Sequence, residues 1–496
     1  MEWVGISDLE DRRRDAARYG PPLEQSAVMR GLAPFQLLML AGLVVALAAI
    51  VWLRPHQLPG GLVAAAAAVF LTVAIWRVLL ILISVVRLPE PAVPERWPRY
   101  TVVAALHDEA DIVGQLIERL SRIDYPADRL QGLLALEAHD HDTIAAARAA
   151  PRPDWLDILV TPPGKPQTKP RALNYALARA TGDLLTVYDA EDAPDPGQLR
   201  EAAARFAADR TGRLACLQVP LRIRPAPGFI ARQFSAEYAS LFEAVLPGMA
   251  RLGLPFPLGG TSNHFRVDLL REVGGWAAWN VTEDADLGFR LWSRGLRLGV
   301  LRRPTWEAPP GGFPLWLPQR TRWLKGYLQT WGVHTRQPWR LGLRGVLALL
   351  MTLGAGLASA AIHGLCLAWV AVTVLVPLVA GLPPETPRLA LSVLVLGADS
   401  AWLSCAIGAR RASVPYGPVD MITAPAYWAL LSVAFAHAAW RLVREPFAWD
   451  KTPHRRDASP DADNPTPAAV ETHAALDATA PLRLSAGHAA ASEPVA

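Results

Sequence analysis

The chain has 496 residues, of which 52% are hydrophobic and 19% are charged, and its mean hydropathy is +0.19, a composition that disfavours a wholly soluble protein. Its formal net charge of +4 is too small for a surface that binds phosphates throughout, so no nucleic acid is expected as a partner. The three cysteines, Cys216, Cys366 and Cys405, have no paired spacing, which excludes a disulfide framework and a zinc site of the Cys-x-x-Cys type.

Two apolar segments come first along the chain, at residues 35–53 and at about 61–86. Each approaches or exceeds the roughly 20 residues that cross the hydrocarbon core of a bilayer, so residues 35–87 are predicted to form two transmembrane helices. An arginine run at 12–14 favours a cytosolic N-terminal segment over residues 1–34. Two crossings then return the chain to the cytosol.

Arg77 lies inside the second apolar segment. A charged side chain is costly in the middle of a bilayer. Arg77 therefore either extends to the membrane surface near the true end of the helix, or faces a polar path through the helix bundle. The sequence leaves both interpretations open.

Residues 88–340 are predicted to form a cytosolic α/β domain. An apolar run at 100–106 suits a buried parallel strand, and polar residues at 107–111 precede a helix. Acidic residues follow the second and the fourth expected strands. Strands that alternate with helices and end in acids are typical of a doubly wound, mostly parallel sheet, which binds ligands just beyond the carboxyl ends of its strands. The further strands are expected at 133–136, 155–160 and 183–188, and a helix at 171–180.

Four residues, 189–192, follow the fourth strand directly, and three of them are acidic. Asp189 and Glu191 are placed to hold a hard divalent cation while a diphosphate supplies further oxygens. Residues 139–142 alternate His and Asp, but alternation puts the histidines and the acids on opposite faces of a strand. A loop on the nucleotide side is therefore preferred there to a metal cluster.

Two further motifs lie towards the end of this domain. The run Thr282-Glu283-Asp284 precedes a helical pattern and offers a carboxylate that could act as a general base, although acids are also common in the first turn of a helix. The run at 319–323, Gln-Arg-Thr-Arg-Trp, combines cations with an indole shortly before the next apolar segment. A basic, aromatic helix at the membrane interface is the ordinary alternative for this run.

Three or four transmembrane or interfacial helices are expected over residues 341–445. The apolar segment at about 343–382 is long enough for two spans with a break near His363, or for one interfacial helix followed by one span. The apolar segments lie at about 343–382, 389–408 and 421–443.

The number of crossings decides on which side the C-terminus lies. Four crossings after the domain return it to the cytosol but place Arg410 and Arg411 outside, against the positive-inside rule. Three crossings satisfy these arginines and leave the C-terminus outside. We expect four. Residues 446–496 contain few large apolar side chains and are expected to form a disordered tail.

The order of these features resembles that of the processive family 2 glycosyltransferases of membranes, which include cellulose, hyaluronan and poly-N-acetylglucosamine synthases. The acidic pair, Thr-Glu-Asp and Gln-x-x-Arg-Trp follow one another over residues 98–335, with apolar segments on both sides. Residues 259–263 and 273–276 stand where the family has its acceptor-side loop and its Val-Gly-Gly turn, and 447–454 resemble a Trp-x-Lys-Thr-x-His segment that often closes the last membrane helix. The resemblance implies a GT-A-like catalytic domain inserted between transmembrane helices.

On the donor side, the resemblance implies a role for each matched residue. Glu137 matches an acid that contacts the uracil and ribose, where most members have Asp. Lys169 and Arg171 match basic residues near the nucleotide. Asp189 and Glu191 match the metal-binding Asp-x-Asp, with Glu in place of the second Asp, and imply Mg²⁺ or Mn²⁺ as cofactor.

On the acceptor side, Asp284 matches the family base that takes the proton of the acceptor hydroxyl. Thr282 and Glu283 lie beside it and are expected to contact the acceptor. The motif Gln-x-x-Arg-Trp supplies the rest of the implied site: Gln319 and Arg322 on the nucleotide-sugar diphosphate, and Trp323 stacked on the acceptor sugar.

We therefore predict an inverting β-glycosyltransferase of the bacterial inner membrane with a cytosolic catalytic domain. Its partners are a UDP-sugar, a growing glycan or lipid acceptor and the lipid bilayer, and polymerisation and export of an exopolysaccharide is the favoured activity. One alternative is the transfer of a single sugar to a lipid. The other, a transporter or scaffold with a degenerate transferase domain, is disfavoured because the acids, the base and Gln-x-x-Arg-Trp are all present.

Overall fold

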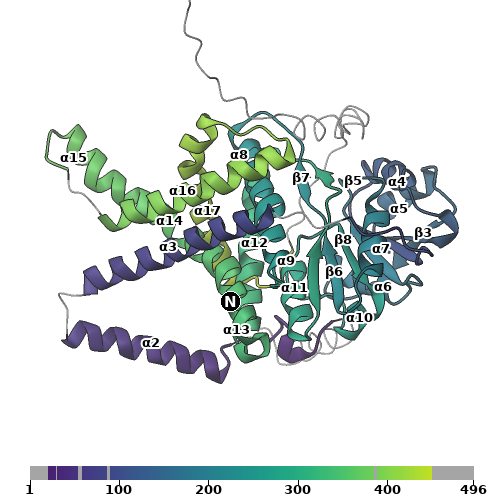
Figure 1. The fold of residues 1–496 in the computed structure, drawn as a ribbon, viewed down its shortest axis with the longest axis horizontal. Helices are drawn as coiled ribbons and strands as arrows, with labels where there is room; N and C mark the ends of the chain where they lie inside the picture. Colours follow the sequence, from purple (N-terminus) through teal and green to yellow (C-terminus); the bar gives the residue numbers. More distant parts are fainter. Residues whose placement is uncertain (1–19, 30, 54–57, 86–89, 385–387, 450–496) are drawn as a thin grey trace, which may run out of the picture. The chain divides into compact units, whose positions relative to one another are not determined.

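A mixed sheet of seven strands forms the centre of the α/β part, which lies between the apolar helices in the sequence and beside them in Figure 1. The structure is a computed structural model that describes residues 20–29, 31–53, 58–85, 90–384 and 388–449. In spatial order, the strands are β3 (Leu156–Thr161), β2 (Leu130–Glu137), β1 (Tyr100–Leu106), β4 (Leu184–Tyr188), β8 (Asn263–Arg266), β6 (Leu214–Gln218) and β9 (Arg297–Val300).

The order in which the chain adds strands to this sheet reverses between β1 and β4. The chain moves outward from β1 to β2 and β3 through parallel pairs, and β4 then pairs in parallel with the other side of β1. Only β8 runs antiparallel to its two described neighbours. The predicted doubly wound, mostly parallel sheet is confirmed, and ligands of such sheets bind outside the carboxyl ends of the strands at this switch point.

Helices cover both faces of the sheet because side chains alternate along each strand. In β1, Val102 and Ala104 join one buried hydrophobic cluster, and Val103 joins the other. The first cluster includes side chains of α4 (Val113–Ser121), α5 (His141–Ala149) and α7 (Gln198–Ala207). The second includes side chains of α6 (Lys169–Leu177), α10 (Val267–Glu272) and α11 (Glu283–Ser293).

A second, small sheet lies beside the acidic turn that follows β4. In it, Trp306 pairs with Ala193, which directly follows the acids at 189–192. This pairing brings a segment more than 100 residues further along the chain next to the acidic turn. The sheet consists of β5 (Ala193–Pro194), β10 (Thr305–Glu307) and β7 (Leu221–Ile223).

The helix predicted at 171–180 begins and ends earlier, as α6, at Lys169–Leu177. Pro170 lies in its first turn, where the missing N–H of proline costs no hydrogen bond. The early start places Lys169 at the first position of the helix, next to the carboxyl ends of the strands.

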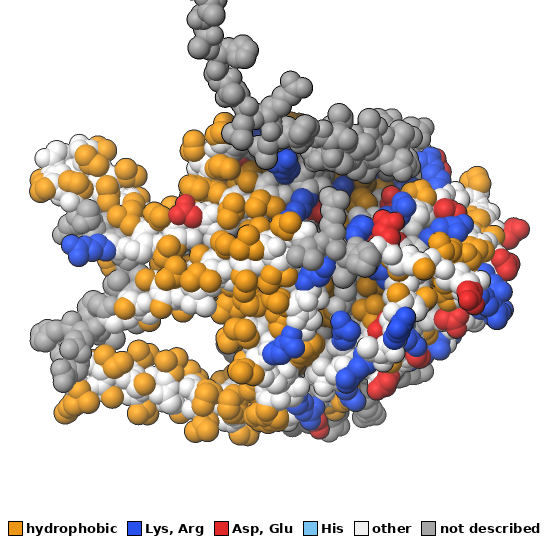
Figure 2. All heavy atoms as spheres, viewed as in Figure 1, with side chains coloured by type: hydrophobic (Ala, Val, Ile, Leu, Met, Phe, Trp, Pro, Cys, Tyr) orange, Lys and Arg blue, Asp and Glu red, His pale blue; other side chains and the backbone are white. Residues whose placement is uncertain are grey.

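Five helices of the described residues are long and apolar enough to cross a membrane. Figure 2 shows hydrophobic side chains over these helices and charged side chains over the α/β part. Two precede the sheet, α2 (Pro34–Leu53) and α3 (Leu58–Ser84). Three follow it: a continuous helix made of α13 (Gly342–Leu349), η6 (Leu350–Gly354), α14 (Ala355–Val370), η7 (Ala371–Leu375) and α15 (Val376–Val379); α16 (Arg388–Ala412); and α17 (Pro418–Arg444).

The expected break near His363 is absent, and the described residues from 338 onward hold three helices that are long and apolar enough to cross a membrane, the lower of the two numbers predicted. The helix continues through His363 and Gly364, with π-helical turns at η6 and η7 instead. Its first part packs on the domain, because Leu349 and Leu353 belong to the same buried cluster as Leu287 of α11. This arrangement matches the alternative of one interfacial segment followed by one span.

Two helices lie between the sheet and the apolar helices. α8 (Phe229–Ser240) continues through η4 (Leu241–Val245) and α9 (Leu246–Arg251), and packs against α16. α12 (Phe313–His334) packs along α17. Arg77 of α3 lies within electrostatic range of the carboxylate of Glu237 in α8, which favours the interpretation that it faces the helix bundle.

Two predicted segments are described only in part. The arginine run at 12–14 lies outside the described residues, as does the tail from residue 450 onward. Residues 446–449, which were expected to begin the disordered tail, are described: Phe447 contacts the ring of Trp279 at 5.2 Å between centroids, and Gln329 of α12 donates to the carbonyl of Pro446.

Candidate active site

A cavity of about 260 Å³ lies at the switch point of the sheet. All of the site residues predicted from the sequence line it, except Arg171. They are Glu137, Lys169, Asp189, Glu191, Thr282, Glu283, Asp284, Gln319, Arg322 and Trp323.

The local structure explains why these residues meet. Glu137 ends β2 and Asp189 follows β4, and the carboxyl ends of parallel strands lie at one edge of a sheet. Gln319, Arg322 and Trp323 occupy positions i, i+3 and i+4 of α12, which share one face of a helix. The spacing of Gln-x-x-Arg-Trp is therefore the spacing that a helix needs to present all three side chains to one cavity.

Arg171 is placed differently from its prediction. It is two positions after Lys169 in α6, about 200° around the helix, so the two side chains point to opposite sides. Arg171 is buried and donates to the carboxylate of Glu137 and to the carbonyl of Pro162, each at 2.9 Å. The structure therefore makes Arg171 a support for Glu137 from behind the cavity.

Lys169 forms an ion pair with Asp189 at the donor side of the cavity. Its ammonium also donates to the carbonyl of Gly260 at 2.7 Å. Burial lowers the pKa of Lys169, but the carboxylates of Asp189 and Glu283 raise it by more than burial lowers it. The net pKa of Lys169 therefore lies above its usual value. Lys169 therefore remains a cation, which suits the binding of a diphosphate.

Several carboxyl groups cluster around Asp189. Asp192 is fully buried, and its Oδ2 accepts from the backbone N–H of Asp189 at 2.8 Å. Burial raises the pKa of Asp192 well above its usual range, and the charges of Asp189 and Glu191 raise it further. Oxygen ligands of this kind are what Mg²⁺ and Mn²⁺ prefer. The residues present therefore fit a divalent cation bound by Asp189 and Glu191.

Glu307 is a cavity residue that the sequence analysis missed. It ends β10 and lines the cavity, and its Oε1 is buried without a hydrogen-bond partner. Burial raises its pKa well above the usual range, and Asp192, Glu191 and Asp189 raise it further. A three-residue strand in a second sheet has too little periodicity for a sequence to reveal it, so no signal pointed to Glu307.

The carboxylate of Asp284 points towards the glycine pair that precedes β8. A Cβ on Gly260 would lie 3.3 Å from its Oδ2, so glycine leaves room beside the carboxylate. Burial raises the pKa of Asp284 to about 6, although the N–H of Ala285 and the cations Lys169 and Arg322 oppose this shift. Burial also raises the pKa of the neighbouring Glu283, to about 8, with a further contribution from the charge of Asp284.

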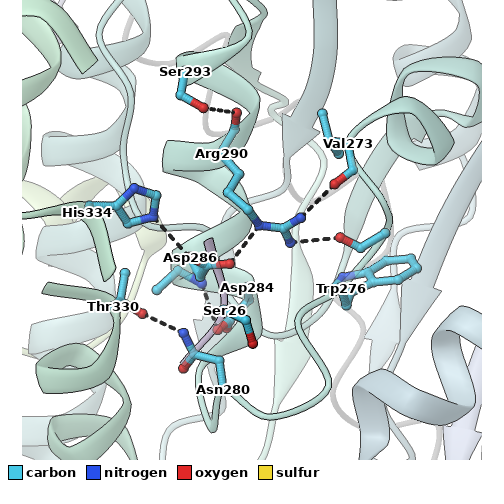
Figure 3. Close-up of polar contacts among 12 residues, drawn as sticks. Ser26, Val273, Trp276, Asn280, Asp284, Asp286, Arg290, Ser293, Thr330 and His334 are labelled. Atoms are coloured by element: carbon cyan, nitrogen blue, oxygen red, sulfur yellow. Dashed lines mark hydrogen bonds and ion pairs between the residues drawn. The ribbon is translucent and has the colours of Figure 1, made fainter. Parts of the chain in front are cut away.

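A buried polar network holds the helix that begins beside Asp284 (Figure 3). Asp286 accepts from Arg290 at 2.7 Å and contacts His334 of α12 at 2.9 Å. Arg290 also donates to the carbonyls of Val273 and Gly275, at 2.9 and 2.7 Å. The network thus ties α11 to α12 and to the Val-Gly-Gly turn.

The loop before Asp284 is tied to α12 as well. Asn280 donates to Thr330 at 3.0 Å, and the N–H of Val281 donates to Gln329 at 3.1 Å. A Cβ on Gly326 would lie 2.4 Å from Oγ1 of Thr282, so glycine allows α12 to approach this loop closely. These contacts consequently hold the loop before Asp284 against the helix that carries Gln-x-x-Arg-Trp.

The segment after α17 reaches the cavity. Trp449 lines it, and the guanidinium of Arg322 lies 4.8 Å from the centroid of a Trp449 ring. Lys325 of α12 fixes this segment by donating to the carbonyls of Glu445 and Ala448, at 3.1 and 2.7 Å. The sequence indicates this segment only through its family resemblance, which predicts no site residue in it.

Several buried polar atoms of the cavity residues have no hydrogen-bond partner. Native proteins satisfy most buried polar groups, so a group of unsatisfied atoms around one cavity indicates a site for a polar ligand. They are Thr282 Oγ1, Glu307 Oε1, Gln319 Oε1 and Arg322 Nε.

A separate His/Asp cluster lies just beyond the carboxyl ends of β1 and β2. One ligand atom from each of His107, Asp108 and Asp140 lies within 4.8 Å of the others, and the rings of His107 and His139 meet at 5.1 Å. His107 and His139 line the cavity, whereas His141 and Asp142 begin α5 and so lie in a helix where a loop was expected. Asp140 also caps α5, since its side chain accepts from the N–H of Thr143.

Comparisons with known proteins match the same part of the chain. A model described as "Glycosyl transferase family 2" matches residues 101–239, and one described as "Glycosyl transferase family group 2" matches residues 184–396. The chain is 29% identical over 253 residues to the beta-monoglucosyldiacylglycerol synthase of Synechocystis sp., covering 49% of this chain and 51% of that protein.

Two further proteins are similar to this chain. It is 25% identical over 253 residues to the catalytic subunit of the UDP-forming cellulose synthase 1 of Komagataeibacter xylinus, covering 50% of this chain and 33% of that protein. The mannosyltransferase PcManGT from Pyrobaculum calidifontis, solved with GDP-Man and Mn²⁺, aligns with a TM-score of 0.46 at 19% identity, over 76% of this chain and 99% of that one. The chain spans about half the length, or less, of the two curated relatives described.

Proposed function

We propose, from the premise that the chain belongs to the family 2 glycosyltransferases, that it transfers sugar residues from UDP-sugar to an acceptor held at a membrane face, with inversion at the anomeric carbon. The observation that carries the proposal is one cavity lined by the half-buried carboxylate of Asp284, by the acidic turn at Asp189 and Glu191, and by Arg322 and Trp323. The similarity to a UDP-forming cellulose synthase supports UDP as the nucleotide.

In this reaction, the acceptor hydroxyl oxygen forms a bond to the anomeric carbon, and the bond from that carbon to the diphosphate breaks. Asp284 accepts the hydroxyl proton, which makes the attacking oxygen more nucleophilic. No covalent intermediate with the protein is needed, because the proton goes to the base and the leaving group departs as UDP.

The departing diphosphate requires positive charge, and electrostatic stabilisation of this kind commonly contributes most to the rate enhancement of an enzyme. Lys169 and Arg322 supply two cations at the cavity. A divalent cation bound by Asp189 and Glu191 would supply further neutralisation of the leaving diphosphate. Glu137, held by Arg171, is then available to the ribose and base of the nucleotide.

The acceptor side supports a polymer product. Trp323 offers an indole face that suits the apolar face of a sugar ring and provides binding that does not depend on chain length. A lipid acceptor is the second candidate, because Leu241, Phe242 and Leu258 line the same cavity and suit an apolar body.

A panel of nucleotide sugars separates these possibilities. We expect purified membranes with radiolabelled UDP-sugars to form large labelled material with one of them, and EDTA to abolish the reaction until Mg²⁺ or Mn²⁺ is restored. If all the label is found in a lipid that carries one sugar and is extracted by organic solvent, the product is a glycolipid and the polymer proposal is wrong. No transfer from any UDP-sugar, or full activity in EDTA, would contradict the UDP-sugar donor or the metal, respectively.

We also propose that α17 lies along the membrane face and does not cross the membrane. Near its start, Asp420 pairs with Arg232 of α8, and just beyond its end Lys325 of α12 holds Glu445 and Ala448. A helix of 27 residues is about 40 Å long, which exceeds the roughly 30 Å hydrocarbon core, so a crossing would put its ends on opposite sides. Both ends of α17 instead contact helices next to the catalytic domain.

With only α14–α15 and α16 crossing after the domain, Arg410, Arg411 and the C-terminus all come to the side of the catalytic domain. Arg411 there donates to Ser84 and to the carbonyl of Glu243, each at 2.7 Å. This topology removes the conflict between the positive-inside rule and a cytosolic C-terminus that both three and four crossings create.

Cysteine labelling tests this topology. In a chain without its native cysteines, we expect Leu382→Cys, between α15 and α16, to react with a membrane-impermeant maleimide in intact cells. Ser413→Cys, between α16 and α17, is expected to react only after lysis. Labelling of Ser413→Cys in intact cells would contradict the topology, and the reverse pattern would place the catalytic domain away from cytosolic UDP-sugars.

A further inference from the structure

We infer that Arg320 is a positioning residue for the acceptor: together with Glu237 it fixes the indole of Trp323. The inference rests on the proposed function, in which Trp323 packs against the acceptor. Arg320 lies inside the Gln-x-x-Arg-Trp motif but does not line the cavity, and its side chain points to α8 and α17.

Arg320 and Glu237 form a polar network with Tyr427 of α17. The buried guanidinium contacts both carboxylate oxygens of Glu237, with Nη1 to Oε1 at 2.9 Å. Tyr427 uses its one proton towards Glu237 at 2.9 Å, and its oxygen accepts from Arg320 at 3.0 Å and from Trp316 at 3.1 Å. One donor and two acceptor sites are the full capacity of a hydroxyl, so this tyrosine has one defined orientation.

The same guanidinium contacts the ring of Trp323. Its central carbon lies 4.6 Å from the centroid of the indole, within the range of a cation–π interaction. Trp323 also approaches Phe234 and Tyr238 of α8, at 6.0 and 6.1 Å between ring centroids. Arg320 therefore orients the indole directly through its guanidinium. It also acts through α8, because the ion pair between Arg320 and Glu237 holds α8 and its aromatic rings against α12.

A second ion pair in the same region serves as a structural reference. Arg232 and Asp420 join α8 to α17, with contacts of 2.7 and 2.5 Å, and the structure shows no ring contact between Arg232 and Trp323. The Arg320–Glu237 pair joins α12 to α8 and reaches α17 through Tyr427, so both pairs hold α8 against a neighbouring helix. Of these two arginines, Arg320 is the one that contacts the ring of Trp323.

The test uses the full chain in lipid nanodiscs, with Arg320→Lys as the variant because it keeps the positive charge. The rate of sugar transfer to the acceptor is expected to fall about tenfold, because lysine loses the planar contact with Trp323 and the bidentate pairing with Glu237. UDP binding in the presence of Mg²⁺, and hydrolysis of the UDP-sugar by water, are expected to stay unchanged. The control Arg232→Lys is expected to leave all three measurements at the wild-type level.

A double-mutant cycle provides a readout that a merely structural role would not give. If Arg320 acts through Trp323, the variant Arg320→Lys/Trp323→Ala transfers no less sugar to the acceptor than Trp323→Ala alone. Additive losses, weaker UDP binding in Arg320→Lys, or the same loss in Arg232→Lys would each overturn the inference. Failure of the wild type to transfer sugar to any acceptor would instead refute the proposed function.

Discussion

Replacement of Asp284 by asparagine is expected to lower turnover by about 10²–10⁴-fold, the usual contribution of a positioned general base. Asparagine keeps the shape of the side chain and an acceptor for the N–H of Ala285, but it cannot take the full proton of the acceptor hydroxyl. Turnover in membranes and UDP binding by calorimetry separate the two roles, because UDP binding is expected to change little. Wild-type turnover in Asp284→Asn would contradict the assignment.

The pH profile tests the same assignment independently. The base acts in its ionised form, and its pKa is raised to about 6, so the wild-type rate is expected to fall as the pH drops through about 6. The residual activity of Asp284→Asn should lack this acid limb. Glu283, with a pKa raised to about 8, remains largely neutral at pH 7 and is expected to contribute no such limb. A wild-type rate that stays constant down to pH 5 would exclude Asp284 as the titrating base.

Much of the candidate site was predictable because its residues stand at positions that secondary structure brings together. Acids at the ends of β2 and β4 share one edge of the sheet, and residues at i, i+3 and i+4 of a helix share one face. The same periodicity also limits the prediction. Lys169 and Arg171 are two positions apart, so α6 cannot present both to the cavity, and the structure places only Lys169 there.

The parts that the sequence did not reveal depend on contacts between distant segments. Glu307 reaches the acidic turn only through the pairing of β10 with β5, which no local pattern encodes. Arg320 looked like one more cation of an interfacial helix, and only its contacts with Glu237 and Trp323 distinguish it.

The arrangement of the apolar helices was hard to predict for a related reason. Hydropathy measures whether a segment is apolar enough to cross a membrane, and α17 meets that criterion. An apolar helix that lies along a membrane face, packed between α12 and α14, has the same composition. The contacts at the two ends of α17 carry the distinction, and they are long-range.

The second large effect is expected on stability, from the buried pair Asp286–Arg290 behind the base. Both side chains are almost completely buried, and they lie four positions apart in α11. Arg290→Met removes one partner and leaves a charged carboxylate in the interior with His334 alone. Breaking a buried pair in this way costs about 3–5 kcal/mol, because the remaining charge has lost both its partner and its water.

The matched control is Arg122→Met, since Arg122 also pairs with a carboxylate four positions away, Glu118, but both side chains are exposed, at 40% and 49%. An exposed pair of this kind contributes about 0.3–0.5 kcal/mol. Thermal unfolding in detergent is therefore expected to show a loss of roughly 10 °C in melting temperature for Arg290→Met, and little change for the control. Equal, small shifts of the melting temperature in both variants would show that the interior compensates for the lost arginine. The network in Figure 3 would then not be what holds α11 in place.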